Sequence, residues 1–483
     1  MRPVIRFLAR ARAGGALLLG LATGTCATNP VTGKRELSFV SESQEISMGR
    51  EYAGQVSREM GVYPDSSVQS YVGRLGREIA VTTERPRLPW TFTVMDDPAV
   101  NAFALPGGFI FVTRGILTHM NSEAELATVV GHEIGHVTAR HSVQQMTRQQ
   151  IAQIGLVAGA IASEKIAQNI GVISQGLGVL FLKYGRDDET QADDLGFRYA
   201  LNDGYDVRKM VDMFAILQRI TAQAGARVPE WQSTHPDPGN RIEATKRRLS
   251  KVTVPLDDKK VNRDQFLRAI DGMVYGDNPR QGFFRGTSFL HPDLAFQLDF
   301  PTGWKTANQP SSVIGVSSQQ DAQVQLSLAG QVAPAQALQQ FLGQEGIQAG
   351  RSGQTTINGN TAALGTFTAQ SQEGGTLSGL AAFISYGGTT YQLLGITAAA
   401  YSAYERTFQG FVASFRRLTD PAALGVKPNR IQVVRLSRPM TLSAFNQQYP
   451  STIPIEALAL INGVQDGSSG FSTSTLVKRV VAN

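Results

Sequence analysis

The sequence is poor in cysteine and contains no long hydrophobic run. Only one of the 483 residues is cysteine, so the chain cannot form an internal disulfide bond. Residues 151–182 are rich in glycine, alanine and isoleucine, but Glu164 and Lys165 interrupt them, so no span of ~20 apolar residues exists. This absence excludes a transmembrane helix there and leaves two interpretations, buried helices or a hairpin that faces substrate.

The chain also lacks clusters of positive charge. Lysine and arginine are dispersed, and no nucleic-acid-binding motif accompanies them, so no nucleic-acid partner is predicted. Residues 1–26 contain four arginines, no acid and an apolar run over residues 13–22, which is typical of a secretory signal and too short to span a membrane. Without those arginines the net charge falls from +6 to +2. We therefore expect an exported, globular, periplasmic protein.

The single cysteine, Cys26, follows the apolar run directly. An acylated lipoprotein cysteine would stand there, which would attach the protein to the outer membrane. The preceding residues 22–25 depart from the usual lipobox, which prefers leucine three positions before the cysteine and a small residue just before it. Three interpretations remain open: lipidation of Cys26, its removal with the signal, or a free thiol.

A His-Glu-x-x-His motif occupies residues 132–136. Ser122 and Glu125 have the spacing of a capping box, so the sequence predicts a helix that begins there and carries the motif. His132 and His136 would share one helix face and could both reach one Zn²⁺ at roughly 2.0–2.1 Å, with Glu133 beside them to deprotonate a water. The alternative is a helix with structural histidines, but six histidines in the whole chain make an accidental match a poor explanation.

A zinc site of this type needs a third protein ligand, and an acidic run at residues 186–194 supplies candidates. Glu189 and Asp193 are four residues apart and would lie on one helix face. We predict Glu189 as the third ligand and Asp193 as the acceptor of a hydrogen bond from the non-ligating nitrogen of one histidine. The alternative is a solvated acidic start of a helix.

Four motifs, at residues 100–112, 131–137, 189–193 and 234–242, resemble the successive motifs of the HtpX- and BepA-like gluzincin metallopeptidases, which are relatives of the CAAX prenyl proteases. The resemblance covers about residues 36–250. It implies one Zn²⁺ per chain, held by His132, His136 and Glu189, with Glu133 as the general base and active-site roles for His235 and Arg241. It also implies cleavage of envelope proteins or peptides in quality control; the competing interpretation is an envelope chaperone or assembly factor with secondary proteolysis.

Two further segments are expected to lie near the metal. Strands over residues 101–105 and 109–113 would flank a turn, and the edge residues Asn101, Ala102 and Phe103 are candidates for pairing with substrate backbone. They could equally form an ordinary sheet edge. His235 precedes Pro236 and is predicted on a loop, where the resemblance implies oxyanion stabilisation or transient contact with the metal. A solvated loop histidine is the alternative.

The predicted fold class is α+β, in three parts. Residues 27–255 would form a mainly helical, zincin-type peptidase domain with a small sheet, and residues 256–278 a linker. Residues 279–422 would form an α+β sandwich that faintly resembles PsbP and Mog1 at residues 300–304. Residues 428–483 resemble a LysM-like βααβ module, which implies peptidoglycan contact through residues 430–483 or else a packing role without a glycan site.

Overall fold

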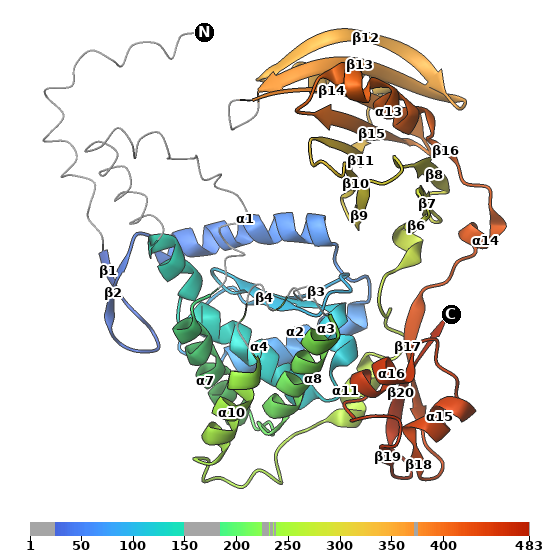
Figure 1. Cartoon of the computed structure of the whole chain (residues 1–483). Coiled ribbons are helices and arrows are strands. Elements are labelled where there is room, and N and C mark those ends of the chain that lie inside the picture. Colours follow the sequence, from blue (N-terminus) through green and yellow to red (C-terminus); the bar gives the residue numbers. More distant parts are fainter. Residues whose placement is uncertain are drawn as a thin grey trace, which may run out of the picture.

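The structure is a computed structural model that describes residues 25–148, 184–224, 231, 235, 238–370 and 375–482. Figure 1 shows a helical part around a small sheet, a strongly curved sheet domain, and a small C-terminal module beside the helices. Among the described residues, no helix is long and apolar enough to cross a membrane. The expected secretory signal and the segment 151–182 lie outside the described residues, except for Thr25 and Cys26, whose backbones pair with Ser38 and Leu37.

The helical part begins with a hairpin and two helices. Strands β1 (Thr25–Thr28) and β2 (Arg35–Ser38) pair antiparallel. Helix α1 (Glu42–Met60) begins at Ser41, whose capping box with Gln44 satisfies backbone N–H groups at the helix start. Helix α2 (Ser66–Ala80) begins after Asp65 and buries Val68, Val72, Leu75 and Ile79. The apolar face of α2 packs on the sheet because only that face lacks charge.

A three-stranded sheet lies between α1 on one face and α2 on the other. Strands β3 (Thr91–Met95), β4 (Ala102–Leu105) and β5 (Phe109–Thr113) are ordered β3-β5-β4, with β3 parallel and β4 antiparallel to β5. The predicted pair of strands around a turn is confirmed. The turn needs its glycines, because Gly107 and Gly108 have φ angles of 80° and 102°. Because the strand order ends with β4, this strand is an edge of the described sheet, as the substrate-pairing prediction requires.

The motif helix is α4 (Glu123–Thr138), which follows the short helix α3 (Arg114–His119). Ser122 caps α4 as predicted, but the Glu125 carboxylate accepts from the Asn121 N–H at 2.7 Å, one residue before the expected position. Apart from Val129, every residue of α4 is buried. Arg140 adopts a left-handed conformation with φ of 60°, and residues 141–148 are helical again.

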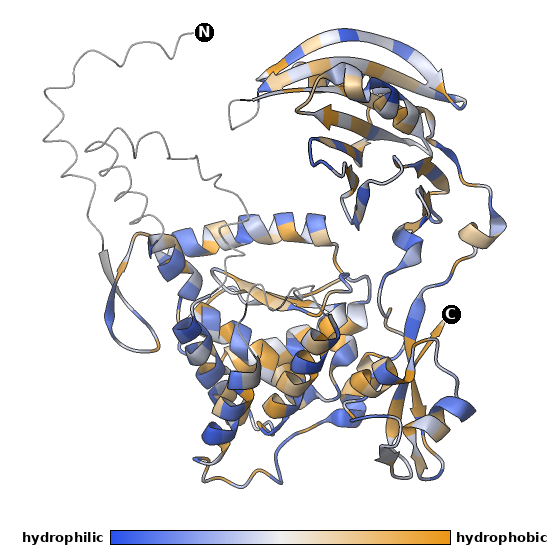
Figure 2. Cartoon of the chain, viewed as in Figure 1, coloured by the Kyte–Doolittle hydropathy of each residue, from blue (hydrophilic) through white to orange (hydrophobic). Residues whose placement is uncertain are grey.

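Helix α7 (Arg186–Asn202) packs closely against α4, and α8 (Lys209–Ala224) and α10 (Pro238–Leu249) lie beside them. A Cβ on Gly196 would lie 2.7 Å from the backbone nitrogen of His132, so only glycine permits this approach. Figure 2 shows mostly hydrophilic residues on α7 and α10 and mostly hydrophobic ones on the small sheet. Helix α10 begins at Pro238, because proline at a first helical position needs no N–H partner.

Residues 256–278 were expected to form a linker, but the structure shows part of them in the hydrophobic core. The segment contains helix α11 (Arg263–Ala269), whose Phe266 and Leu267 are fully buried in the same hydrophobic core as α2 and α4. Met273 and Val274 belong to that core as well. The prediction was wrong because the segment is mostly polar, and a few apolar residues at helical spacing are enough to anchor a short helix.

Residues 279–424 form the curved-sheet domain. A seven-stranded sheet has the order β12-β13-β14-β15-β11-β10-β9, and a four-stranded sheet the order β16-β8-β7-β6. Asn358 and Gly359, with φ of 47° and 83°, make the hairpin turn between β12 and β13. The elements are η2 (Pro279–Gln281), β6 (Phe283–Arg285), β7 (Ser288–His291), β8 (Phe296–Asp299), β9 (Lys305–Gln309), β10 (Ser312–Val316), β11 (Ala322–Gly330), α12 (Pro334–Leu342), β12 (Ile347–Ile357), β13 (Asn360–Gln370), β14 (Thr376–Tyr386), β15 (Thr389–Thr397), α13 (Tyr401–Ala413), β16 (Arg416–Arg417) and α14 (Pro421–Leu424).

The C-terminal module has the predicted strand, helix, helix, strand order. Strands β17 (Asn429–Arg435) and β20 (Leu476–Ala482) pair antiparallel and enclose α15 (Leu442–Gln448) and α16 (Ile455–Ile461). Short strands β18 (Met440–Thr441) and β19 (Gly470–Phe471) pair with each other. The order alone does not establish a LysM module, which remains a prediction.

Candidate metal centre

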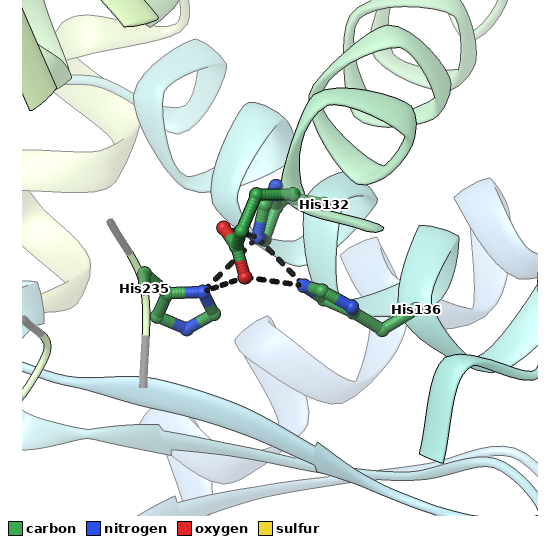
Figure 3. Close-up of side chains that lie close together, drawn as sticks. His132, His136 and His235 are labelled. Atoms are coloured by element: carbon green, nitrogen blue, oxygen red, sulfur yellow. Dashed lines mark hydrogen bonds and ion pairs between the residues drawn. The ribbon is translucent and has the colours of Figure 1, made fainter. Parts of the chain in front are cut away.

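Four side chains from separate elements converge at one point. His132 and His136 come from α4, Glu189 comes from the first turns of α7, and His235 lies between α8 and α10. One ligand atom from each lies within 4.8 Å of all the others, and all four residues are buried. In Figure 3 the three imidazole rings surround one carboxylate. Sequence reasoning selected all four residues for the site, with His235 assigned only through the family resemblance.

The distances within the cluster fit a tetrahedral metal. The Nε2 atoms of His132 and His136 are 3.0 Å apart, and His235 Nδ1 lies 3.4 Å from His132 Nε2 and 2.8 Å from Glu189 Oε1. A tetrahedral Zn²⁺ with bonds of about 2.0–2.1 Å requires separations of about 3.3 Å between ligand atoms. Oε2 of Glu189 is buried without a hydrogen-bond partner, which is costly unless a cation binds nearby. The donor set of histidine and carboxylate therefore fits Zn²⁺.

Asp193 and Arg241 hold His132 from behind. Asp193 Oδ1 lies 3.0 Å from His132 Nδ1, where the sequence predicted a carboxylate partner for a ligand histidine. Arg241 donates to both Asp193 oxygens, at 2.6 and 2.9 Å. Burial opposes ionisation of Asp193, but Arg241 and the His132 hydrogen bond outweigh it and lower the pKa of Asp193 to about 2. Arg241 thus pairs with Asp193 and serves to position His132.

Glu133 lies next to the cluster on the same helix. Its Oε1 is 3.8 Å from His235 Nε2, its Oε2 is buried without a hydrogen-bond partner, and the residue lines a pocket beside the metal residues. Burial raises the pKa of Glu133, although the nearby histidines oppose this shift. A carboxylate with a raised pKa next to a metal site is suited to accept a proton from water.

A small apolar pocket of ≈ 40 Å³ opens beside Glu133. The edge-strand residues Asn101 and Ala102 line it, as expected for a substrate site. Phe103 does not: its ring stacks on Phe111 at 5.0 Å, in a cluster on the other side of the sheet. Consecutive residues within β4 point to opposite faces, so Ala102 and Phe103 cannot both face the pocket, whereas Asn101 precedes the strand. The remaining pocket wall comes mainly from α8: Met210, Met213, Phe214 and Leu217.

Sequence reasoning missed three residues that surround His136. His141 Nδ1 lies 2.9 Å from His136 Nδ1, and His141 Nε2 lies 2.9 Å from Gln191 Oε1. The ring of Tyr184 stacks on His136, with centroids 3.9 Å apart and planes 18° apart. His141 was visible as a histidine five residues after His136, but the left-handed turn at Arg140 that brings it back was not.

Helix α4 with its two histidines, the carboxylate from α7 and the adjacent glutamate have the arrangement typical of metalloproteases of the His-Glu-x-x-His class. Residues 66–249, less than half of the chain, match the model of peptidase family M48. The match ends before the curved-sheet domain and the C-terminal module.

Among curated relatives, the chain is 32% identical over 181 residues to the mitochondrial metalloendopeptidase OMA1 of Arabidopsis thaliana, covering 37% of this chain and 36% of that protein. It is 27% identical over 239 residues to the beta-barrel assembly-enhancing protease of Escherichia coli, covering 47% of this chain and 48% of the relative. The OMA1 protein of Schizosaccharomyces pombe is 29% identical over 241 residues, 49% of this chain and 68% of that protein. The chain spans less than half the length of the beta-barrel assembly-enhancing proteases it matches.

Solved structures similar to this one include the cyanobacterial PsbP of Synechocystis, with 11% identity over 28% of this chain and 95% of that chain. The Ran-binding protein Mog1p of Saccharomyces cerevisiae has 12% identity over 28% of this chain and 97% of that chain. Both have a TM-score of 0.22, which is too low to assign the fold of any part.

Proposed function

We propose that the protein is a zinc-dependent endopeptidase of the cell envelope. The observation that carries this proposal is the buried cluster of His132, His136, Glu189 and His235, with tetrahedral spacing and Glu133 beside it. The matched family and the metalloendopeptidase relatives support the same activity.

In the proposed reaction His132, His136 and Glu189 hold the metal. A bound Zn²⁺ supplies Lewis acidity and lowers the pKa of water to about 7. Glu133 accepts a proton from the attacking water, while Asp193 and Arg241 keep His132 oriented. The edge strand β4 offers its backbone to an extended substrate, and the apolar pocket receives a substrate side chain.

His235 is proposed as an off-switch. A catalytic zinc site keeps one position for water, but here His235 Nδ1 occupies the place of a fourth ligand, 2.8 Å from Glu189 Oε1 and 3.4 Å from His132 Nε2. This geometry favours the metal-contact role over that of an oxyanion donor.

Replacing His235 separates its two proposed roles. As an off-switch, His235→Ala raises basal cleavage of an unstructured protein substrate; as an oxyanion donor it lowers kcat by about 10²–10³-fold. Steady-state rates at matched zinc content decide between them. An unchanged rate would remove both roles.

The cellular role is proposed from the relatives and the sequence. We propose a periplasmic protein that degrades misassembled envelope proteins, with outer-membrane attachment through Cys26 and peptidoglycan contact through residues 430–483. The alternative is an envelope chaperone or assembly factor with secondary proteolysis, which the closed position of His235 favours because it limits turnover.

Replacing the general base tests the activity itself. Glu133→Gln should abolish cleavage of a disordered substrate protein while zinc content stays at one per chain, because the base is lost and the ligands are kept. Asp194→Asn, an exposed carboxylate on α7, is the matched control and should cleave normally. Cleavage by the Glu133→Gln variant at the original rate would contradict the proposal. Envelope proteins that accumulate on this inactive variant would identify the substrates.

A further inference from the structure

The two α4 histidines of the cluster use the same ring nitrogen toward the metal and have different partners at the other. His132 and His136 both direct Nε2 into the cluster. Nδ1 of His132 faces the carboxylate of Asp193 at 3.0 Å. Nδ1 of His136 faces another imidazole, that of His141, at 2.9 Å, and no acid takes that place among the described residues.

This contact requires one arrangement of protons. A neutral His136 that ligates through Nε2 carries its proton on Nδ1, so it must donate to an acceptor there. His141 Nδ1 can accept only if the His141 proton is on Nε2. That Nε2–H has an acceptor, because Gln191 Oε1 lies 2.9 Å away. The two hydrogen bonds, from His136 to His141 and from His141 to Gln191, can therefore form together when each ring has one particular tautomer.

The fold holds this chain of contacts in place from two sides. His141 is buried, and the left-handed Arg140 turns the backbone so that His141 comes back over His136. Gln191 is two residues beyond Glu189 on α7, so one helix supplies both a ligand and the end of the chain of contacts. Tyr184 stacks on the His136 ring at 3.9 Å and restricts its rotation.

We propose that His141 and Gln191 are positioning residues that fix the tautomer and orientation of His136 for metal binding. The proposal rests on the proposed zinc site and extends it: the site has two separate supports, an ion pair behind His132 and a neutral chain of two side chains behind His136. A neutral support adds no negative charge beside the metal, so it orients His136 without neutralising the cation further.

The test measures zinc affinity of the full-length protein by competition with a chelating dye, which does not depend on cleavage. His141→Leu removes the acceptor and should weaken zinc binding about 10–100-fold, the range typical for partners of ligand histidines. His141→Asn places an amide oxygen near the position of Nδ1 and should restore most of this loss. Gln191→Leu should give a smaller loss than His141→Leu, and Gln191→Glu should give none.

His119→Leu is the matched control, because His119 is a mostly buried histidine outside the cluster and bonds to the Gly115 carbonyl. It should leave zinc affinity unchanged. The visible absorption of the Co²⁺-loaded protein provides a second readout: His141→Leu should alter it, and His141→Asn should return it to the original spectrum. If His141 had a merely structural role, His141→Leu would leave the Co²⁺ spectrum unchanged, and His141→Asn would have no altered spectrum to restore.

Two outcomes overturn the inference and are distinguishable from failure of the proposed function. If the unaltered protein binds zinc and His141→Leu binds it within twofold, or if His141→Asn loses as much as His141→Leu, the positioning role is wrong and the zinc site stands. If the unaltered protein itself binds no zinc, the proposed function fails together with the inference.

Discussion

The two regions that follow the segment matched by family M48 are joined to the helical part of the molecule in different ways. Leu476 of the C-terminal module lies inside the main core of the peptidase domain, and Val433 packs against it. The hydrophobic clusters of the curved-sheet domain, among the residues described, consist only of its own side chains. The module is thus part of the helical unit in packing terms, and the larger domain is an appendage.

A buried lysine makes the attachment of the module specific. Lys478 on β20 is completely buried, and its Nζ donates to the Thr118 and Met120 carbonyls at 3.0 and 2.6 Å, where α3 ends. A cation at the C-terminus of a helix satisfies carbonyls that lack helical partners. Burial lowers the pKa of Lys478 and raises that of Glu125 in the first turn of α4, and the electrostatic attraction between the two groups opposes both shifts.

The path of the chain explains how the appendage can sit between two parts of one unit. The Tyr275 N–H donates to the Asn429 carbonyl at 2.8 Å, and the Ile431 N–H donates to the Met273 carbonyl at 2.8 Å. The chain therefore leaves at residue 275 and returns beside the same point at residue 429, with the curved-sheet domain between (Figure 1). In structural terms that domain is an insertion.

The largest effect is expected from removing the module. A chain that ends at residue 426 should unfold or aggregate, since it exposes the core around Leu476 and leaves the α3 carbonyls unpaired. Replacing residues 278–426 with a short Gly/Ser linker should instead leave a folded, zinc-binding protein. Thermal unfolding and zinc content of both variants check this. The comparison would be reversed if the chain that ends at residue 426 were stable and the chain without residues 278–426 were unstable.

A smaller effect is expected from the single contact at Lys478. Lys478→Met should lower the free energy of unfolding by about 2–4 kcal/mol, because two buried carbonyls lose their hydrogen-bond donor. Lys427→Met, at an exposed lysine outside the module, is the control and should be neutral. Urea unfolding of both gives the numbers. Equal stability of the two variants would mean that the buried charge does not anchor the module.

The smallest effect concerns pH at the same contact. Burial, aided by the nearby Lys478 charge, lowers the pKa of His119 to about 4, from 6.5 in the unfolded chain. His119 is thus neutral when folded, and its contribution to stability, full above pH 6.5, is lost as pH falls towards 4. Between pH 6.5 and pH 4 the free energy of unfolding of the unaltered protein should fall by on the order of 2 kcal/mol more than that of the His119→Leu variant. The prediction is contradicted if the free energies of unfolding of the two proteins fall by the same amount over this pH range.

Much of the metal site could be predicted because its residues obey helical spacing. His132 and His136, and likewise Glu189 and Asp193, are four residues apart, so a helix places each pair on one face whatever surrounds it. His141 could not be assigned, because its contact depends on a left-handed residue that ends the helix. Phe103 was misplaced because the face of a short strand is set by what packs against it.

The order of helices and strands was largely determined by the sequence, through caps, apolar periodicity and turn glycines that act over a few residues. The domain boundaries were decided only by tertiary structure: α11 belongs to the core and not to a linker, and residues 429–482 pack on the first domain. These outcomes rest on contacts such as Lys478 with Thr118, 360 residues apart, which depend on how complete surfaces fit together. Local sequence patterns carry no information on such contacts, so the sequence alone predicted the chemistry of the site and left its support to the fold.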